Sequence, residues 1–174
     1  ETRHPLVNVV ECDKIGKPVA HCRKHFDMYV IYIKDVICAD YVTYGRGVYD
    51  FQENTLVFVG PGQILGYPED GSTFQPKGWC LYFSLELLRG TSLAGRMREY
   101  SFFSYATNEA LHISQQERQT IIDCLRKIDD EIAGGNDRHS NLIIASAVEL
   151  FLNYCRRFYD RQFITRKKIN KDII

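Results

Sequence analysis

The 174-residue chain has no long hydrophobic run. No stretch approaches the roughly 18 uninterrupted apolar residues that a membrane-spanning helix needs. The first five residues, ETRHP, also lack the charged-then-apolar layout of a secretory signal peptide. We therefore expect neither a membrane partner nor secretion.

An excess of charge of either sign is absent as well. The chain has 22 Lys and Arg against 22 Asp and Glu, with an isoelectric point of about 7.2. A chain with this balance is not a nucleic-acid binder as a whole, so any such contact is expected to be local. Its six cysteines include no Cys-x-x-Cys pair and are too sparse for a small disulfide scaffold. We expect reduced thiols in a cytoplasmic protein.

Motifs for phosphate-binding loops and for serine nucleophiles are missing. Nucleotide hydrolysis and acyl transfer through serine are therefore disfavoured, and we predict no catalytic residue and no cofactor. One local cluster of metal-binding side chains exists, at His21 and His25, ahead of an expected strand. A strand holds positions i and i+4 far apart, and no third ligand is nearby, so we also predict no metal site.

The pattern that is present divides a single compact domain near residue 110. Up to about residue 85, apolar residues form short runs between turns rich in glycine and proline, which is typical of many short strands. The connections are too short for parallel crossovers, which indicates an antiparallel sandwich or barrel. The expected strands are residues 6–10, 28–38, 41–44, 55–59 and 79–85.

Helical spacing begins after residue 110. Ser114 and Glu117 form a capping box that predicts a helix start, and Gly134-Gly135 predicts its end through a left-handed cap. A second helix is expected from residue 137 or 138. Its apolar residues cover a wide arc, so one stripe is expected to remain for a second copy of the chain in a two-fold dimer. The predicted dimer face is Ile144, Val148, Phe151 and Cys155, at positions i, i+4, i+7 and i+11.

Aromatic residues are frequent in the strand-rich half, and Tyr and Trp combine an apolar ring with one hydrogen-bonding group. We interpret them as the lining of a cavity for a sugar or an aromatic metabolite, with core filling as the alternative for each. Arg46, between two glycines, either binds an anionic ligand or belongs to a solvated turn. The candidate pocket residues are His25, Tyr29, Tyr32, Tyr44, Arg46, Tyr49, Phe58, Trp79 and Tyr82.

The end of the chain is basic. Residues 156–174 contain seven Lys and Arg and two Asp. Such a segment is either a solvated linker or a contact for nucleic acid or for a further part of the chain. Asn170 is expected to cap a further helix, as in a domain excised from a longer protein.

Several of these segments resemble the N-terminal regulatory half of AraC-family transcription regulators, particularly those of Bacteroides-like bacteria. The resemblance covers nearly the whole chain. Its segments are residues 4–7, 44–46, 49–51, 56–58, 61–63 and 78–79 in the strand-rich half, and residues 109–114 and 157–166 around the helices.

The resemblance implies a mainly β fold, a cupin double-stranded β-helix or jelly-roll barrel, followed by an antiparallel helical pair. Residues 1–110 would form the barrel as a small-molecule sensor, and residues 111–160 the helical pair used for dimerisation. Residues 161–174 would be a basic linker toward a helix-turn-helix DNA-binding domain outside this chain. Among the metal-binding positions of cupins, only His25 lies in roughly the expected place.

The sequence thus predicts a non-catalytic sensor. Its small-molecule effector would change the arrangement of the helices, and so DNA binding by the further domain. Two alternatives remain open at this point. One is a cupin-fold enzyme, a sugar epimerase or a metal-dependent oxygenase that binds its metal through His21, His25 or His112. The other is a pure dimerisation module with a filled core.

Overall fold

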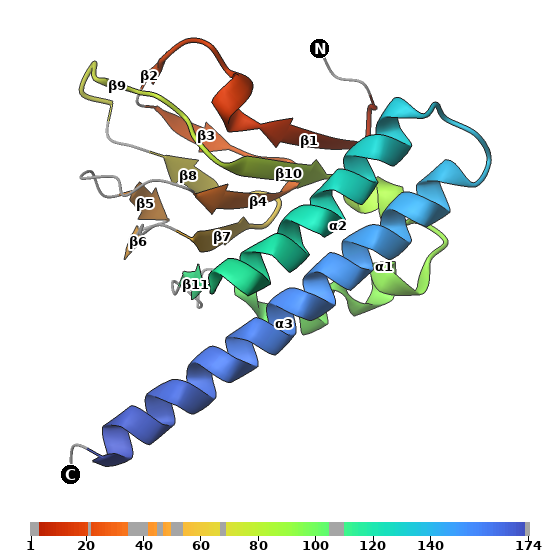
Figure 1. Ribbon diagram of the computed structural model, residues 1–174. Coiled ribbons are helices and arrows are strands. Elements are labelled where there is room, and N and C mark those ends of the chain that lie inside the picture. The colour runs from red at the N-terminus through yellow and green to blue at the C-terminus, as the bar shows by residue number, and fades with distance from the viewer. Residues whose placement is uncertain are drawn as a thin grey trace.

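Antiparallel strands make up the first part of the chain and two long helices the last (Figure 1). The structure is a computed structural model that describes residues 4–20, 22–34, 42–44, 47–49, 54–66, 69–104 and 110–172. For residues 42–44 and 47–49 the description is limited to the backbone. Helical residues outnumber strand residues, so the expected mainly β class is corrected to a mixed class of antiparallel sheets with C-terminal helices.

A five-stranded antiparallel sheet forms the centre of the fold. Its order is β1-β10-β4-β7-β11. In register, Ile31 of β4 lies between Leu81 of β10 and Phe58 of β7, so apolar side chains of three strands meet on one face. The strands are β1 (Val7–Glu11), β4 (Tyr29–Lys34), β7 (Thr55–Val59), β10 (Trp79–Phe83) and β11 (Leu111–His112).

Two smaller antiparallel sheets lie against the opposite face of the central sheet. One pairs β2 (Val19–Ala20) with β9 (Thr73–Phe74). The other has the order β3-β8-β5-β6. Its strands are β3 (Arg23–His25), β5 (Val42–Tyr44), β6 (Gly47–Tyr49) and β8 (Ile64–Gly66).

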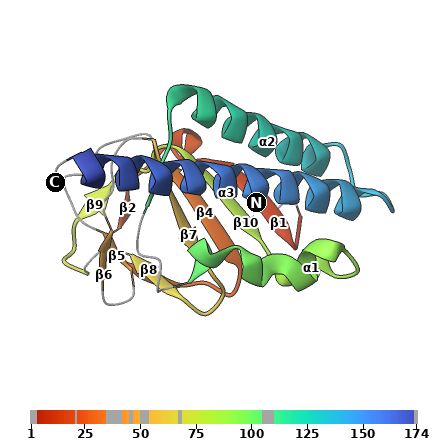
Figure 2. The ribbon, with the colours of Figure 1, turned by 90° about the horizontal axis from the view of Figure 1, so that it is seen from below.

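The helices cover the remaining face of the central sheet. α2 (Gln115–Ala133) packs along α3 (Ser140–Asp172), and α2 also contacts β1. Figure 2 shows α3 crossing the central sheet between α2 and the segment that contains α1 (Ser92–Arg96). Short 3-10 turns flank these elements, at Cys12–Lys14, Leu85–Leu88, Met97–Glu99 and Ser101–Phe103.

Side-chain alternation gives the central sheet two separate apolar faces. Ile31, Phe58, Leu81 and Phe83 pack with the buried residues of α2 and α3 in the large core. Their neighbours in the strands point the other way. Val30, Val57 and Val59 form a second cluster with Phe26, Leu65 and Phe74 of the opposing layer.

The expected strands correspond to elements of the structure. The strand predicted at 55–59 is β7, and those predicted at 6–10 and 79–85 overlap β1 and β10. The strands predicted at 28–38 and 41–44 overlap β4 and β5, while residues 35–41 lie outside the described part. Every strand pair of the described part is antiparallel, as the short connections predict. Among the described residues, no helix combines the length and the apolarity needed to cross a membrane.

The predicted boundaries of α2 are confirmed. The Glu117 amide donates to Ser114 Oγ at 3.2 Å, and the Ser114 amide donates to Glu117 Oε2 at 2.8 Å, which completes the capping box. At the other end, Gly135 has φ of 102°, a left-handed conformation that glycine adopts without the steric cost of a Cβ.

The expected break after residue 160 is wrong as a statement about secondary structure. α3 continues to Asp172, so Asn170 lies inside a helix and does not cap a new one. The physical reason is composition: residues 161–172 contain no Pro or Gly, and five of the twelve are Arg or Lys, which favour helix. The basic segment therefore leaves the domain as a helical extension (Figure 1).

Removing the capping hydroxyl of α2 should destabilise the protein measurably. We expect Ser114→Ala to lower the free energy of unfolding by about 1 kcal/mol, because the Glu117 amide loses its acceptor. Ser146→Ala is the control, since Ser146 lies in α3 and its hydroxyl donates only to the Leu142 carbonyl one turn earlier. Urea denaturation of both variants tests this, and equal stabilities would contradict it.

Candidate functional site

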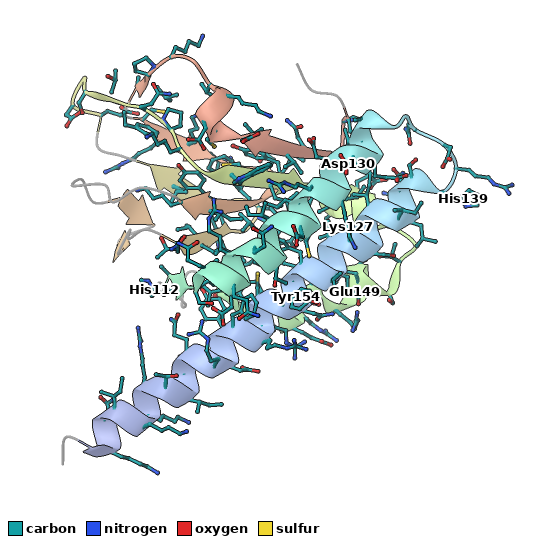
Figure 3. The ribbon with its side chains drawn as sticks, viewed as in Figure 1. His112, Lys127, Asp130, His139, Glu149 and Tyr154 are labelled. Atoms are coloured by element: carbon teal, nitrogen blue, oxygen red, sulfur yellow. The ribbon has the colours of Figure 1, made fainter. Side chains whose placement is uncertain are left out.

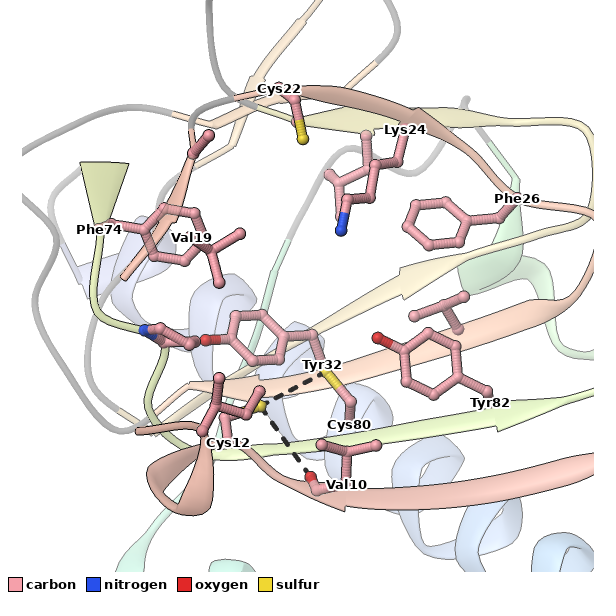
Figure 4. Close-up of a pocket in the computed structure, with 16 residues that line it drawn as sticks. Val10, Cys12, Val19, Cys22, Lys24, Phe26, Tyr32, Phe74, Cys80 and Tyr82 are labelled. Atoms are coloured by element: carbon pink, nitrogen blue, oxygen red, sulfur yellow. Dashed lines mark hydrogen bonds between the residues drawn. The ribbon is translucent and has the colours of Figure 1, made fainter. Parts of the chain in front are cut away.

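A cavity of about 180 Å³ lies between the central sheet and the two smaller sheets, on the side away from the helices (Figure 4). Most of its wall is apolar. The lining residues are Val10, Cys12, Ile15, Val19, Ala20, Cys22, Lys24, Phe26, Val30, Tyr32, Leu65, Gly66, Phe74, Pro76, Cys80 and Tyr82.

The central strands supply the floor of the cavity through alternate residues. Val30 and Tyr32 of β4 and Cys80 and Tyr82 of β10 line it, whereas Ile31 and the other intervening residues face the helices. The opposing layer supplies the other wall, including Lys24 from β3 and Phe74 from β9.

Polar groups in this wall are few, and two of them are tyrosine hydroxyls. The hydroxyl of Tyr32 donates to the Lys77 carbonyl at 2.7 Å. Burial, followed by the charge of the Cys80 side chain and its hydrogen bond with Tyr82, raises the pKa of Tyr82 well above its usual value. The phenol is protonated at neutral pH, as a tyrosine ordinarily is, and a ligand oxygen would replace the weakly accepting Cys80 sulfur as its hydrogen-bond partner.

Two thiols lie in contact at the edge of the cavity. Cys12 Sγ is 3.8 Å from Cys80 Sγ and 4.0 Å from the carbonyl oxygen of Val10 (Figure 4). The hydrogen bond between the two thiols, followed by burial, raises the pKa of the Cys80 thiol well above its usual value. Protonated thiols are poor nucleophiles and poor metal ligands, so this pair acts as part of the apolar wall.

No three His, Cys, Asp or Glu side chains of the described residues come together in a way that could hold a metal ion. His25 and His112 belong to different sheets, because His25 is in β3 and His112 is in β11. His21 lies outside the described part.

The structure divides the predicted pocket residues. Tyr32 and Tyr82 line the cavity. The prediction is wrong for Tyr29, Phe58 and Trp79, which belong to or pack against the large core under the helices. Tyr29, for example, stacks on Phe83 with ring centroids 5.0 Å apart. The reason is strand alternation, since an odd shift in position moves a side chain to the other face of the sheet.

The remaining predicted pocket residues do not line the cavity or cannot be placed. His25 is exposed, with Nδ1 3.5 Å from a carboxylate oxygen of Asp27, and it is not part of the cavity wall. Arg46 and the side chains of Tyr44 and Tyr49 lie outside the described part.

Sequence reasoning missed Lys24, which stands next to His25 and points into the cavity (Figure 4). It also missed Cys12, Cys22 and Cys80, together with Phe26 and Phe74. All three residues of β3 are polar, so the sequence shows no alternation of apolar and polar residues there. Such an alternation is the signal that would have identified Lys24 as facing inward. The alternation of Cys80 and Tyr82 with Leu81 and Phe83 was a usable signal for β10.

The predicted dimer face is also wrong. Ile144, Val148, Phe151 and Cys155 are each 0 % exposed within a single chain, because the stripe that they form packs into the large core. The wide apolar arc of α3 packs against α2, β11 and the 3-10 turn at Leu85–Leu88 within the single chain. The apolar residues of α3 that remain exposed are Leu142, Ile143, Leu150, Phe163, Ile164 and Ile169.

The point at which α3 leaves the domain is fixed by polar contacts to β11. The amide side chain of Gln162 accepts from the His112 amide at 2.8 Å and donates to the Ala110 carbonyl at 3.2 Å, as a neighbouring strand would. Arg161 donates to the His112 carbonyl at 2.8 Å and pairs with Glu117 at the start of α2 at 2.9 Å. From residue 163 to residue 171, every side chain of α3 is exposed.

Comparison of the sequence with models of known protein families and with curated proteins found no match. The geometry of the cavity and of α3 therefore carries the functional argument.

The cavity wall requires glycine at position 66. A Cβ at Gly66 would lie 2.1 Å from the Cys22 carbonyl oxygen and 2.6 Å from the Arg23 Cα, because β8 passes so close to β3. We expect Gly66→Ala to lower the free energy of unfolding by about 1–3 kcal/mol through overpacking. The control is Gly95→Ala, since no atom lies within 4 Å of a Cβ there. Chemical denaturation tests this, and similar stabilities for the two variants would contradict it.

Proposed function

We propose that this chain is the regulatory, ligand-sensing and dimerisation domain of an AraC-family transcription regulator. In this proposal the strands form a cupin-type barrel, and a small molecule bound in its cavity controls DNA binding by a helix-turn-helix domain outside the chain. The proposal depends on one observation. The central strands line the cavity with one face and pack against the helices with the other.

This arrangement offers a direct route from ligand to helix. In β10, Cys80 and Tyr82 line the cavity, while Leu81 and Phe83 pack in the core under the helices. Interiors are close-packed, so a ligand that moves one side of a strand also disturbs the packing on the other. The effect depends on different ligand affinities for two arrangements, and such couplings are commonly about 1–3 kcal/mol.

The exit of α3 is suited to transmit the change. Phe58 of β7 lies against Tyr159 of α3 with ring centroids 5.9 Å apart, only one turn before the Gln162 contacts to β11. The helical extension beyond residue 162 has no described core to pack on, so its direction follows from these anchor points.

Dimerisation through an outer stripe of α3 is part of the proposal. Ile143, Ala147, Leu150 and Tyr154 recur at intervals of four, three and four residues, the heptad spacing of helices that pack in pairs. Ile143 and Leu150 are 49 % and 43 % exposed in the single chain, while Ala147 and Tyr154 are partly buried and also pack against the large core. Figure 3 marks Tyr154 midway along the helix, so the stripe occupies its N-terminal half.

Ligand sensing predicts a saturable thermal shift. We expect at least one compound from a panel of sugars, sugar acids and aromatic metabolites to stabilise the chain. At 100 times its dissociation constant, a ligand adds about 2.7 kcal/mol, a rise of several degrees in Tm for a chain of this size. Ala20→Phe should abolish the shift, because Ala20 lines the cavity and a phenyl ring would occupy it.

Ala133→Phe is the matched control, since Ala133 is exposed at the end of α2 and lies outside the cavity. A panel without any shift would overturn the sensing proposal in favour of a dimerisation module. A shift from metal alone would overturn it in favour of an enzyme.

The outer stripe predicts the effect of a charge on self-association. We expect Leu150→Glu to weaken dimerisation at least tenfold, because it places a carboxylate in an apolar interface, and to leave Tm nearly unchanged at low concentration. Ile169→Glu is the control, as Ile169 is 53 % exposed and lies off the stripe. Analytical ultracentrifugation measures both, and a wild-type monomer at high micromolar concentration would refute the dimer.

A further inference from the structure

One cation lines the cavity, and the other described residues of the wall are uncharged. Lys24 is the only charged residue among the described residues of the wall, and none of the described lining residues carries a carboxylate. Lys24 comes from β3, whose neighbouring side chains, Arg23 and His25, are not part of the wall. The Lys24 residue keeps solvent exposure, which places its ammonium group where an open cavity meets water.

A hydrogen-bond donor faces this ammonium group. In Figure 4 the side chain of Lys24 descends from the outer layer, while the hydroxyl of Tyr82 rises toward the same space from β10. The side chain of Tyr82 hydrogen-bonds to Cys80, whose sulfur is a weak acceptor, so Lys24 and Tyr82 can both donate to a stronger acceptor such as a carboxylate. Phe26 and Phe74 lie on either side of this space.

We propose that the cavity binds a small organic monocarboxylate, with its carboxylate between Lys24 and Tyr82 and an aromatic or branched apolar body against Phe26 and Phe74. This inference rests on the proposed sensing function and narrows its ligand class. A carboxylate accepts hydrogen bonds from both donors, and its charge complements the ammonium group.

Sugars fit this wall poorly. Each sugar hydroxyl that leaves water needs a partner, and an unpaired buried polar group is costly. Besides Lys24 and Tyr82, the side chains of the wall offer Tyr32, whose hydroxyl already donates to the Lys77 carbonyl, and weakly hydrogen-bonding thiols. The polar groups of the wall therefore suit one polar head group rather than a ring of hydroxyls.

The volume of the cavity and its single charge narrow the class of ligand further. A cavity of about 180 Å³ is smaller than the roughly 300–1,000 Å³ typical of sites for drug-sized ligands, so the ligand is a small metabolite. Phosphate esters carry up to two charges and more acceptor oxygens, which are usually held by arginines or by several backbone amides. A single ammonium group and a phenol match a single carboxylate.

The test compares acids with their neutral isosteres. Phenylacetate and 4-methylpentanoate are titrated into the whole chain by calorimetry, each against its carboxamide, and glucose and arabinose are titrated as polar comparison ligands. We expect the acids to bind at least tenfold more tightly than the carboxamides. Lys24→Met should weaken the binding of the acids about ten- to one-hundredfold and leave the binding of the carboxamides unchanged. Tyr82→Phe should weaken acid binding severalfold.

Arg23→Met is the matched control, because it removes the same charge from the neighbouring position of β3 but lies outside the cavity wall. It should keep the preference for acids, and Ala20→Phe should abolish binding of both acids and carboxamides. Thermal unfolding of each variant checks that it is folded.

The outcomes separate this inference from the proposed function. Equal affinity for acid and carboxamide, or acid binding unchanged by Lys24→Met, would overturn the inference that the ligand is a carboxylate. The proposed ligand sensing would remain. Sugar binding without acid binding would do the same. If neither the acids, the carboxamides nor the sugars bind, the proposed function itself fails.

Discussion

The two-sided use of strands β4, β7 and β10 is the constraint on which the rest of the structure depends. Successive side chains of a strand point to opposite faces, so each strand serves the large core and the cavity layer at once. Ile31 and Leu81 hold the helices, while Tyr32 and Tyr82 line the cavity. The cavity and the helices are therefore separated by one layer of backbone, which is the physical basis for the proposed link between a ligand and α3.

Polar groups are placed where backbone would otherwise be left unpaired. The side chain of Gln162 hydrogen-bonds to the Ala110 carbonyl and the His112 amide at the edge of β11, which no further strand of the described part covers. Because a buried unpaired amide or carbonyl is costly, this contact fixes α3 at one residue. The helix can then extend beyond the domain from a defined point, with its basic residues in solvent.

The cavity differs from the aromatic-lined pocket that composition predicts. Most of the aromatic side chains that the structure describes belong to the large core or pack against it, and there Phe58, Phe102 and Phe103 pack edge to face or tilted. Among the described residues, Phe26, Tyr32, Phe74 and Tyr82 reach the cavity, and the rest of its wall comes from aliphatic residues, thiols and Lys24. Residue type alone does not separate these roles, since a phenyl ring is equally suited to a core or to a ligand site.

The sequence by itself determined the local features, because these depend on neighbouring residues: the short antiparallel strands, the cap of α2 at Ser114 and its termination before Gly135. Tertiary structure decided which face each strand turns to the helices, why Ile144 and Phe151 are buried, and how Lys24 comes to face Tyr82. Local periodicity shows that a residue has an apolar or polar face, but the neighbour that covers this face comes from elsewhere in the chain. The site is assembled from β3, β4, β9 and β10, whose juxtaposition only the packing of the sheets provides.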